Sequence, residues 1–124
     1  MAGLKFKRWA NLAQLGPSNF AFSAGFGSTA AATLVAGCDT AFKARITASG
    51  TGQGANPTVT ITFNDPFAAM PIATVTRGSA THQLTIGFLQ DFTNSTAAKL
   101  VLVFNGTPTA NDVYEISVHC QDAA

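Results

Sequence analysis

A chain of 124 residues is long enough for one domain with a hydrophobic core of its own. Charged residues make up only 10% of it, against roughly 25% in an ordinary soluble domain, and the net charge is +1. This balance excludes strong general attraction to nucleic acid or to a membrane surface. Low charge and ten phenylalanines indicate that neighbouring subunits cover part of the surface, and a small protein with an uncharged surface is the alternative.

The first 19 residues differ in composition from the rest. Lys5, Lys7 and Arg8 supply three of the seven positive charges, and Trp9 is the only tryptophan. No continuous apolar stretch follows them, so this is not a signal peptide. A segment this short is marginal as a lone helix in water. We therefore predict an extended N-terminal arm, residues 1–19, that becomes ordered against a partner and binds it through these four side chains. A frayed terminus is the alternative.

Residues 20–124 show short alternating patterns separated by turn residues, which predicts one all-β domain. The clearest pattern is 58–63, where three threonines face one way and Val59, Ile61 and Phe63 face the other. No helical pattern occurs outside the arm. We predict a β-sandwich or a jelly-roll-like barrel of about eight short antiparallel strands. The predicted strands are 20–26, 29–36, 41–48, 58–63, 72–76, 83–89, 99–104 and 113–120.

Two apolar stretches predict contact between subunits. The corner 64–71 is too long and too apolar for a tight hairpin turn, so it should cross between sheets or pack against a neighbour. The Asp65 side chain should cap backbone groups at its start. The run 99–104 is almost continuously apolar, as in a strand that is buried on both faces or lies at a subunit interface. The predicted interface residues are Phe67, Met70, Leu100, Leu102 and Phe104.

No pattern of residues predicts catalysis, a metal site or a cofactor. The six acidic residues fall at turns or on exposed strand faces, with nothing to select a pair. His119 and Cys120 are neighbours on a strand and so point to opposite faces, which rules out a shared tetrahedral site. We expect Cys38 and Cys120 to be reduced, buried thiols. The glycine loop around Gly52 does not lead into a helix and so lacks the geometry of a phosphate-binding loop.

A shallow carbohydrate-binding site on the loops is an alternative interpretation. Its candidates are Phe92 with Asn94, and His82 with Gln83. Buried phenylalanine and solvated polar side chains explain the same residues equally well.

Three stretches carry a resemblance to a known type of protein. They are Ala-Thr-Leu-Val-Ala-Gly at 32–37, the alternating strand with its Asp-Pro-Phe corner, Met-Pro and Val-Thr strand at 59–77, and the closing strand at 113–118. Together they resemble a small β-module of tailed-bacteriophage virion proteins, especially fibres and head-decorating proteins. The resemblance covers roughly residues 30–120 and leaves the arm unexplained.

The resemblance implies a non-enzymatic virion structural protein. Such modules commonly act as homotrimers, so it also implies a homotrimer on the particle exterior. Fibre modules usually lie at the end of a longer chain that carries a shaft, and these 124 residues contain no shaft. This difference favours a stand-alone capsid decoration or cement protein. Its partner would be the major capsid protein, reached through the arm, and it would be made in the host cytoplasm. The alternative is a short tail-fibre or tail-tip module that binds a host surface glycan or receptor.

Overall fold

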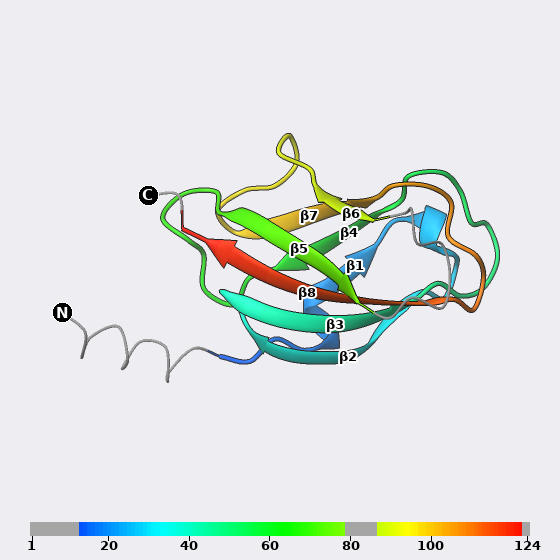
Figure 1. Cartoon of the computed structure of the whole chain (residues 1–124), viewed down its shortest axis with the longest axis horizontal. Coiled ribbons are helices and arrows are strands. Elements are labelled where there is room, and N and C mark those ends of the chain that lie inside the picture. Colours follow the sequence, from blue (N-terminus) through cyan, green and yellow to red (C-terminus); the bar gives the residue numbers. More distant parts are fainter. Residues whose placement is uncertain (1–12, 79–86, 123–124) are drawn as a thin grey trace.

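The computed structural model, described for residues 13–78 and 87–122, is a sandwich of two four-stranded antiparallel sheets (Figure 1). The predicted all-β class is confirmed. The strands are β1 (Phe20–Phe22), β2 (Ala31–Cys38), β3 (Ala41–Thr47), β4 (Thr58–Thr62), β5 (Ile72–Gly78), β6 (Phe88–Gln90), β7 (Lys99–Phe104) and β8 (Val113–Gln121). Two single-turn 3-10 helices, η1 (Pro17–Asn19) and η2 (Ala24–Phe26), complete the described elements.

The strand order is β1-β4-β7-β6 in one sheet and β2-β3-β8-β5 in the other. Only β2–β3 and β6–β7 are neighbours both in sequence and in a sheet, so the other connections cross between sheets. The corner 64–71 lies in one of these crossings, because β4 and β5 belong to different sheets (Figure 1). Sheets in a sandwich lie about 10 Å apart, which a two-residue turn cannot bridge. The prediction that this corner crosses between sheets is therefore confirmed.

Alternation along the strands places the core between the sheets. In β3 the side chains of Phe42, Ala44 and Ile46 are buried, and those between them face solvent. In β8 the same alternation buries Tyr114 and every second residue after it up to Cys120. The core is rich in aromatic rings. Phe26, Phe88, Phe104 and Tyr114 stack or meet edge to face, with centroids 4.8–6.4 Å apart.

Part of the predicted subunit interface is wrong, because three of its residues lie on the inner face of β7. Leu100, Leu102 and Phe104 have no exposed surface within a single chain. They fill the core between the sheets, so a second subunit cannot reach them. The apolar run reflects the strand's inner face together with Val101 and Val103, which alternate with the core residues and point to the outer face.

The predicted strand 20–26 is shorter than expected. The strand β1 ends at Phe22, and the chain then turns through η2. Gly27 follows with a φ of +107°, and a Cβ there would collide with the carbonyl oxygen of Ser49. The turn still delivers the Phe26 ring to the centre of the core, where none of it is exposed. The predicted strand 83–89 is described only from residue 87, and β6 begins at Phe88.

Both edges of the β2-β3-β8-β5 sheet are covered at one end by other parts of the chain. At the β5 edge, the Gln90 side chain accepts a hydrogen bond from the Ala73 backbone N–H (2.8 Å) and donates one to the Pro71 carbonyl (2.9 Å). At the β2 edge, Gln14 forms a β-bridge with Cys38. A β-bulge also interrupts β2 between Ala32 and Leu34.

Candidate functional site

The described part of the predicted arm, residues 13–19, packs onto the sandwich. Leu15 is only 4% exposed and belongs to the hydrophobic core. Its backbone N–H donates a 2.9 Å hydrogen bond to the carbonyl of Gly37. The predicted boundary between arm and domain at residue 19 therefore lies too far along the chain, because these residues are part of the folded domain.

Two asparagines fasten this segment to the corner. The Asn64 side-chain amide donates to the carbonyls of Ala13 (3.3 Å) and Gln14 (3.1 Å). Its Oδ1 accepts a 3.1 Å hydrogen bond from the Asn19 amide, which also donates to the Thr62 carbonyl at 2.7 Å. The backbone that leads into residues 1–12 is thus held by side-chain hydrogen bonds to one end of β4.

A buried carboxylate holds Asn64 in turn. Asp39 lies in the two-residue turn between β2 and β3 and is only 2% exposed. Its Oδ1 accepts the Asn64 backbone N–H at 3.0 Å, and its Oδ2 accepts the Asp65 N–H at 2.9 Å. Asp39 therefore caps the backbone N–H groups at the start of the corner from a turn that is distant in sequence. The sequence predicted this role for Asp65. We call Asp39, Asn64 and Asn19 the anchor cluster.

The sequence did not identify the anchor cluster. An aspartate in a two-residue turn between alternating strands was a signal for Asp39, but a solvated turn residue has the same pattern. The pairing with Asn64 depends on how β4 and the β2–β3 turn meet, across 25 positions of sequence. Short-range patterns carry no such information.

The thiols near the anchor cluster are poorly suited to chemistry. Cys38 and Cys120 are both free and buried. Burial, and in addition the charge of Asp39, raise the pKa of the Cys120 thiol from 9.0 to about 12. A thiol in this state gives almost no nucleophilic thiolate at neutral pH. His119 is exposed while Cys120 is buried, so the two point to opposite faces. No cluster of three metal-binding side chains occurs among the described residues.

The other predicted binding residues fall into three groups. Lys5, Lys7, Arg8 and Trp9 lie outside the described residues, as do His82 and Gln83. Phe67 and Met70, in the corner, are half-buried. The Phe67 ring packs against the Phe63 ring with centroids 4.8 Å apart. The Phe67 backbone N–H donates a 2.9 Å hydrogen bond to the Ala97 carbonyl. Part of each corner side chain therefore stays available to a neighbour.

Phe92 and Asn94 lie in the loop that joins β6 to β7. Phe92 is 59% exposed. Asp91 braces the loop: its Oδ1 accepts the backbone N–H groups of Thr93 (2.9 Å) and Asn94 (3.2 Å), and its Oδ2 accepts the Asn94 side-chain amide at 2.7 Å. The Asn94 side-chain bond is the main cause that lowers the pKa of the Asp91 carboxyl. The loop thus presents an exposed aromatic ring on a fixed backbone.

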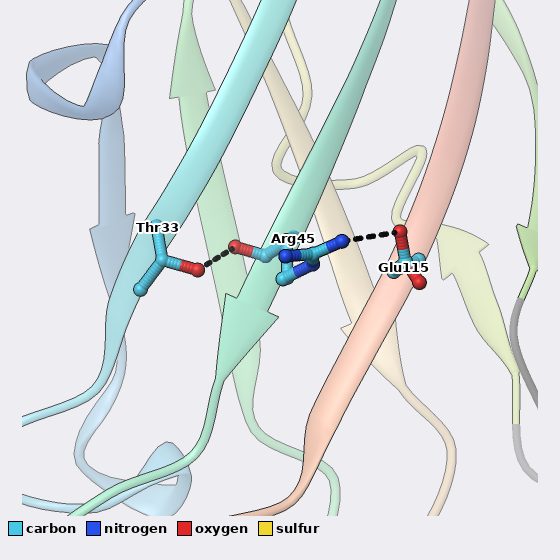
Figure 2. Close-up of polar contacts among 3 residues, drawn as sticks. All are labelled: Thr33, Arg45 and Glu115. Carbon is cyan, nitrogen blue, oxygen red and sulfur yellow. Dashed lines mark hydrogen bonds and ion pairs between the residues drawn. The ribbon is translucent and has the colours of Figure 1, made fainter. Parts of the chain in front are cut away.

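The outer face of the β2-β3-β8-β5 sheet carries charged side chains together with two exposed apolar ones, Leu34 and Ile72, which are 45% and 50% exposed. Figure 2 shows Thr33, Arg45 and Glu115 in a row across β2, β3 and β8. The Thr33 hydroxyl donates to the Arg45 carbonyl, and the Arg45 guanidinium pairs with Glu115, both at 3.3 Å. Two shallow hollows on this face share Lys43 and Ser117. Exposed ion pairs of this kind contribute little stability, so the row marks a solvated surface.

The described residues combine a hydrogen-bonded anchor for the N-terminal segment, one braced loop and the exposed outer face of the β2-β3-β8-β5 sheet. None of their helices is long and apolar enough to cross a membrane. Comparison of the chain with protein-family models, with curated proteins and with solved structures found no match.

Proposed function

We propose that this chain is a non-enzymatic structural protein of a bacteriophage virion, a homotrimeric decoration or cement protein on the capsid exterior. Residues 1–12 would bind the major capsid protein through Lys5, Lys7, Arg8 and Trp9, and the sandwich would cover the shell. Trp and Arg are residue types that often dominate the energy of protein interfaces. Each bound copy stabilises the bound form of the shell by mass action.

The anchor cluster is the observation that carries this proposal. A binding segment on a loose tether loses much of its binding energy to the ordering of the tether. Here the chain is fixed from Ala13 onward by the Asn64 hydrogen bonds and by the burial of Leu15. The basic, tryptophan-bearing segment therefore starts from a defined point at one end of the sandwich. This arrangement suits a domain that sits on a surface and is held there by a short segment.

The decisive experiment is removal of residues 1–12, followed by measurement of the occupancy of the protein on purified particles. The cut must stop before Ala13, because loss of Leu15 would damage the core. We expect a folded domain with an unchanged melting temperature that no longer binds particles. A second variant replaces Lys5, Lys7 and Arg8 with alanine, and the matched control replaces the exposed Lys43 and Lys99 instead. Wild-type occupancy of the shortened protein would refute the proposal.

The braced loop favours one second candidate, a tail-fibre or tail-tip module that binds a host glycan. Sugar rings stack on exposed aromatic side chains, and Phe92 offers such a ring on a backbone fixed by Asp91. This function predicts that purified protein binds oligosaccharides from the host surface and that Phe92→Ala abolishes the binding. Leu34→Ala, an exposed apolar residue on the β2-β3-β8-β5 sheet, is the control.

A further inference from the structure

The turn that follows β7 contains the only Asn-Gly pair in the sequence, Asn105-Gly106. Asparagine is a thermolabile residue, because the backbone nitrogen of the next residue can attack its side-chain amide carbon. Glycine makes this attack easiest, since it has no Cβ to shield the nitrogen. Asn105 is exposed, so ammonia released from its side chain can leave directly into solvent.

The backbone of this turn requires glycine at position 106. Gly106 has a φ of +136°, a conformation that residues with a side chain rarely adopt. The residue that fits the turn is therefore also the one that leaves its nitrogen most open. The reactive pair is a consequence of the turn geometry, and a larger residue could not remove it without strain.

Asn56, in the loop before β4, holds Gly106 by two hydrogen bonds. Its backbone N–H donates to the Gly106 carbonyl at 2.7 Å, and its Oδ1 accepts the Gly106 N–H at 3.0 Å. Asn56 has a φ of +54°, which asparagine adopts more readily than most residues. The Gly106 nitrogen must lose its proton to attack, and a hydrogen bond from that N–H stabilises the protonated form. The Asn56 side chain therefore opposes the reaction.

We propose that Asn105 is a site of spontaneous deamidation and that Asn56 controls its rate. The Gly106 nitrogen forms a bond to the side-chain amide carbon of Asn105, and the bond from that carbon to the amide nitrogen breaks. The proton of the Gly106 N–H passes through water to the leaving group, which departs as ammonia. Water then opens the cyclic imide at either carbonyl and gives aspartate or isoaspartate. The reaction consumes water and releases ammonia, with no oxidation or reduction.

The products change the molecule next to its core. One new carboxylate on a chain of net charge +1 leaves a net charge of 0. Isoaspartate also lengthens the backbone by a methylene directly after Phe104, which has no exposed surface. The Asn105 N–H, which donates to the Gly87 carbonyl at 2.9 Å, lies at the same junction. Converted copies should therefore unfold at a lower temperature, whether or not the protein binds particles.

The experiment incubates purified protein at mildly alkaline pH and follows conversion by peptide mass mapping and by labelling with isoaspartyl methyltransferase. Asn56→Gly removes the side-chain acceptor, keeps the backbone N–H and tolerates the positive φ. It should speed conversion at Asn105 by about threefold to tenfold, the value of one net hydrogen bond. The matched control is Asn56→Asp, which keeps an acceptor oxygen at the same place and should convert no faster than the wild type.

Two further measurements separate this hydrogen bond from a general loosening of the fold. Hydrogen exchange at the Gly106 N–H should accelerate in Asn56→Gly and not in Asn56→Asp. In urea, where the bond is absent, all three proteins should convert at one rate, faster than the folded wild type. Asn105→Gln should abolish the conversion. Equal rates for folded Asn56→Gly and wild type would overturn the proposal, as would conversion at Asn64 or Asn94 as fast as at Asn105.

Discussion

Replacement of Asp39 by alanine tests whether the anchor cluster stabilises the fold. The carboxylate accepts two backbone N–H groups, from Asn64 and Asp65. Hydrogen bonds to a charged group contribute about 1.5–3 kcal/mol each, which sets an upper range of about 3–6 kcal/mol. Asn64 and Asp65 are exposed, so water replaces part of what is lost. We therefore expect Asp39→Ala to lower the free energy of unfolding by about 3 kcal/mol.

The assay is thermal and urea unfolding of the wild type and three variants. For 124 residues the unfolding entropy is about 0.26 kcal/mol/K, so a loss of 3 kcal/mol lowers the melting temperature by about 11 °C. Asp39→Asn keeps the shape and one acceptor oxygen, and should lose about half as much. Asp65→Ala is the control: the side chain is exposed, and the change should cost less than about 0.5 kcal/mol. Equal losses for Asp39→Ala and Asp65→Ala would refute the role assigned to the buried carboxylate.

Two further predictions concern the core and one thiol. Phe26→Ala should lower the free energy of unfolding, measured in urea, by about 3–5 kcal/mol, because it leaves a cavity among Phe22, Phe88 and Phe104. The control Phe92→Ala removes an exposed ring and should cost less than about 1 kcal/mol. Similar losses for the two variants would place Phe26 outside the core. The pKa of Cys120 is raised from 9.0 to about 12 in the folded state, so its stabilising effect is complete below pH 9 and is lost as the pH rises toward 12. Between pH 8 and pH 10.5 the wild type should lose about 2 kcal/mol more than Cys120→Ala, and parallel pH profiles for the two proteins would contradict this.

The sequence predicted the elements whose pattern is local. Alternation located β3, β4 and β8 to within one or two residues, because each has one face in the core and the side chains must alternate. The continuous apolar run at 99–104 located β7. The corner 64–71 was predicted to cross between sheets or to pack against a neighbour for the same kind of reason, since its length and apolar character do not suit a hairpin turn. The 3-10 turn η2 was missed, because Phe20, Phe22 and Phe26 keep the parity of a strand even though the chain leaves it after Phe22.

What could not be predicted depends on which strands become neighbours. The inner and outer faces of β7 are both apolar, so the sequence could not tell that Leu100, Leu102 and Phe104 fill the core while Val101 and Val103 face outward. The anchor cluster joins Asn19, Asp39 and Asn64 from three separate turns, and its hydrogen bonds exist only after the sheets have packed. The contribution of residues 13–19 to the core was missed for the same reason.

The side chain of Gln90 protects a strand edge from pairing with another copy of the chain. Chains with little net charge tend to aggregate, and unprotected strand edges give them a template on which β-sheets grow into fibrils. Gln90 occupies the start of the β5 edge, and Gln14 with the bulge in β2 interrupts the opposite edge. Sideways polymerisation is thus hindered on both flanks of that sheet. A chain of net charge +1, which has little charge repulsion between copies, is thus protected from this route of aggregation by its own side chains.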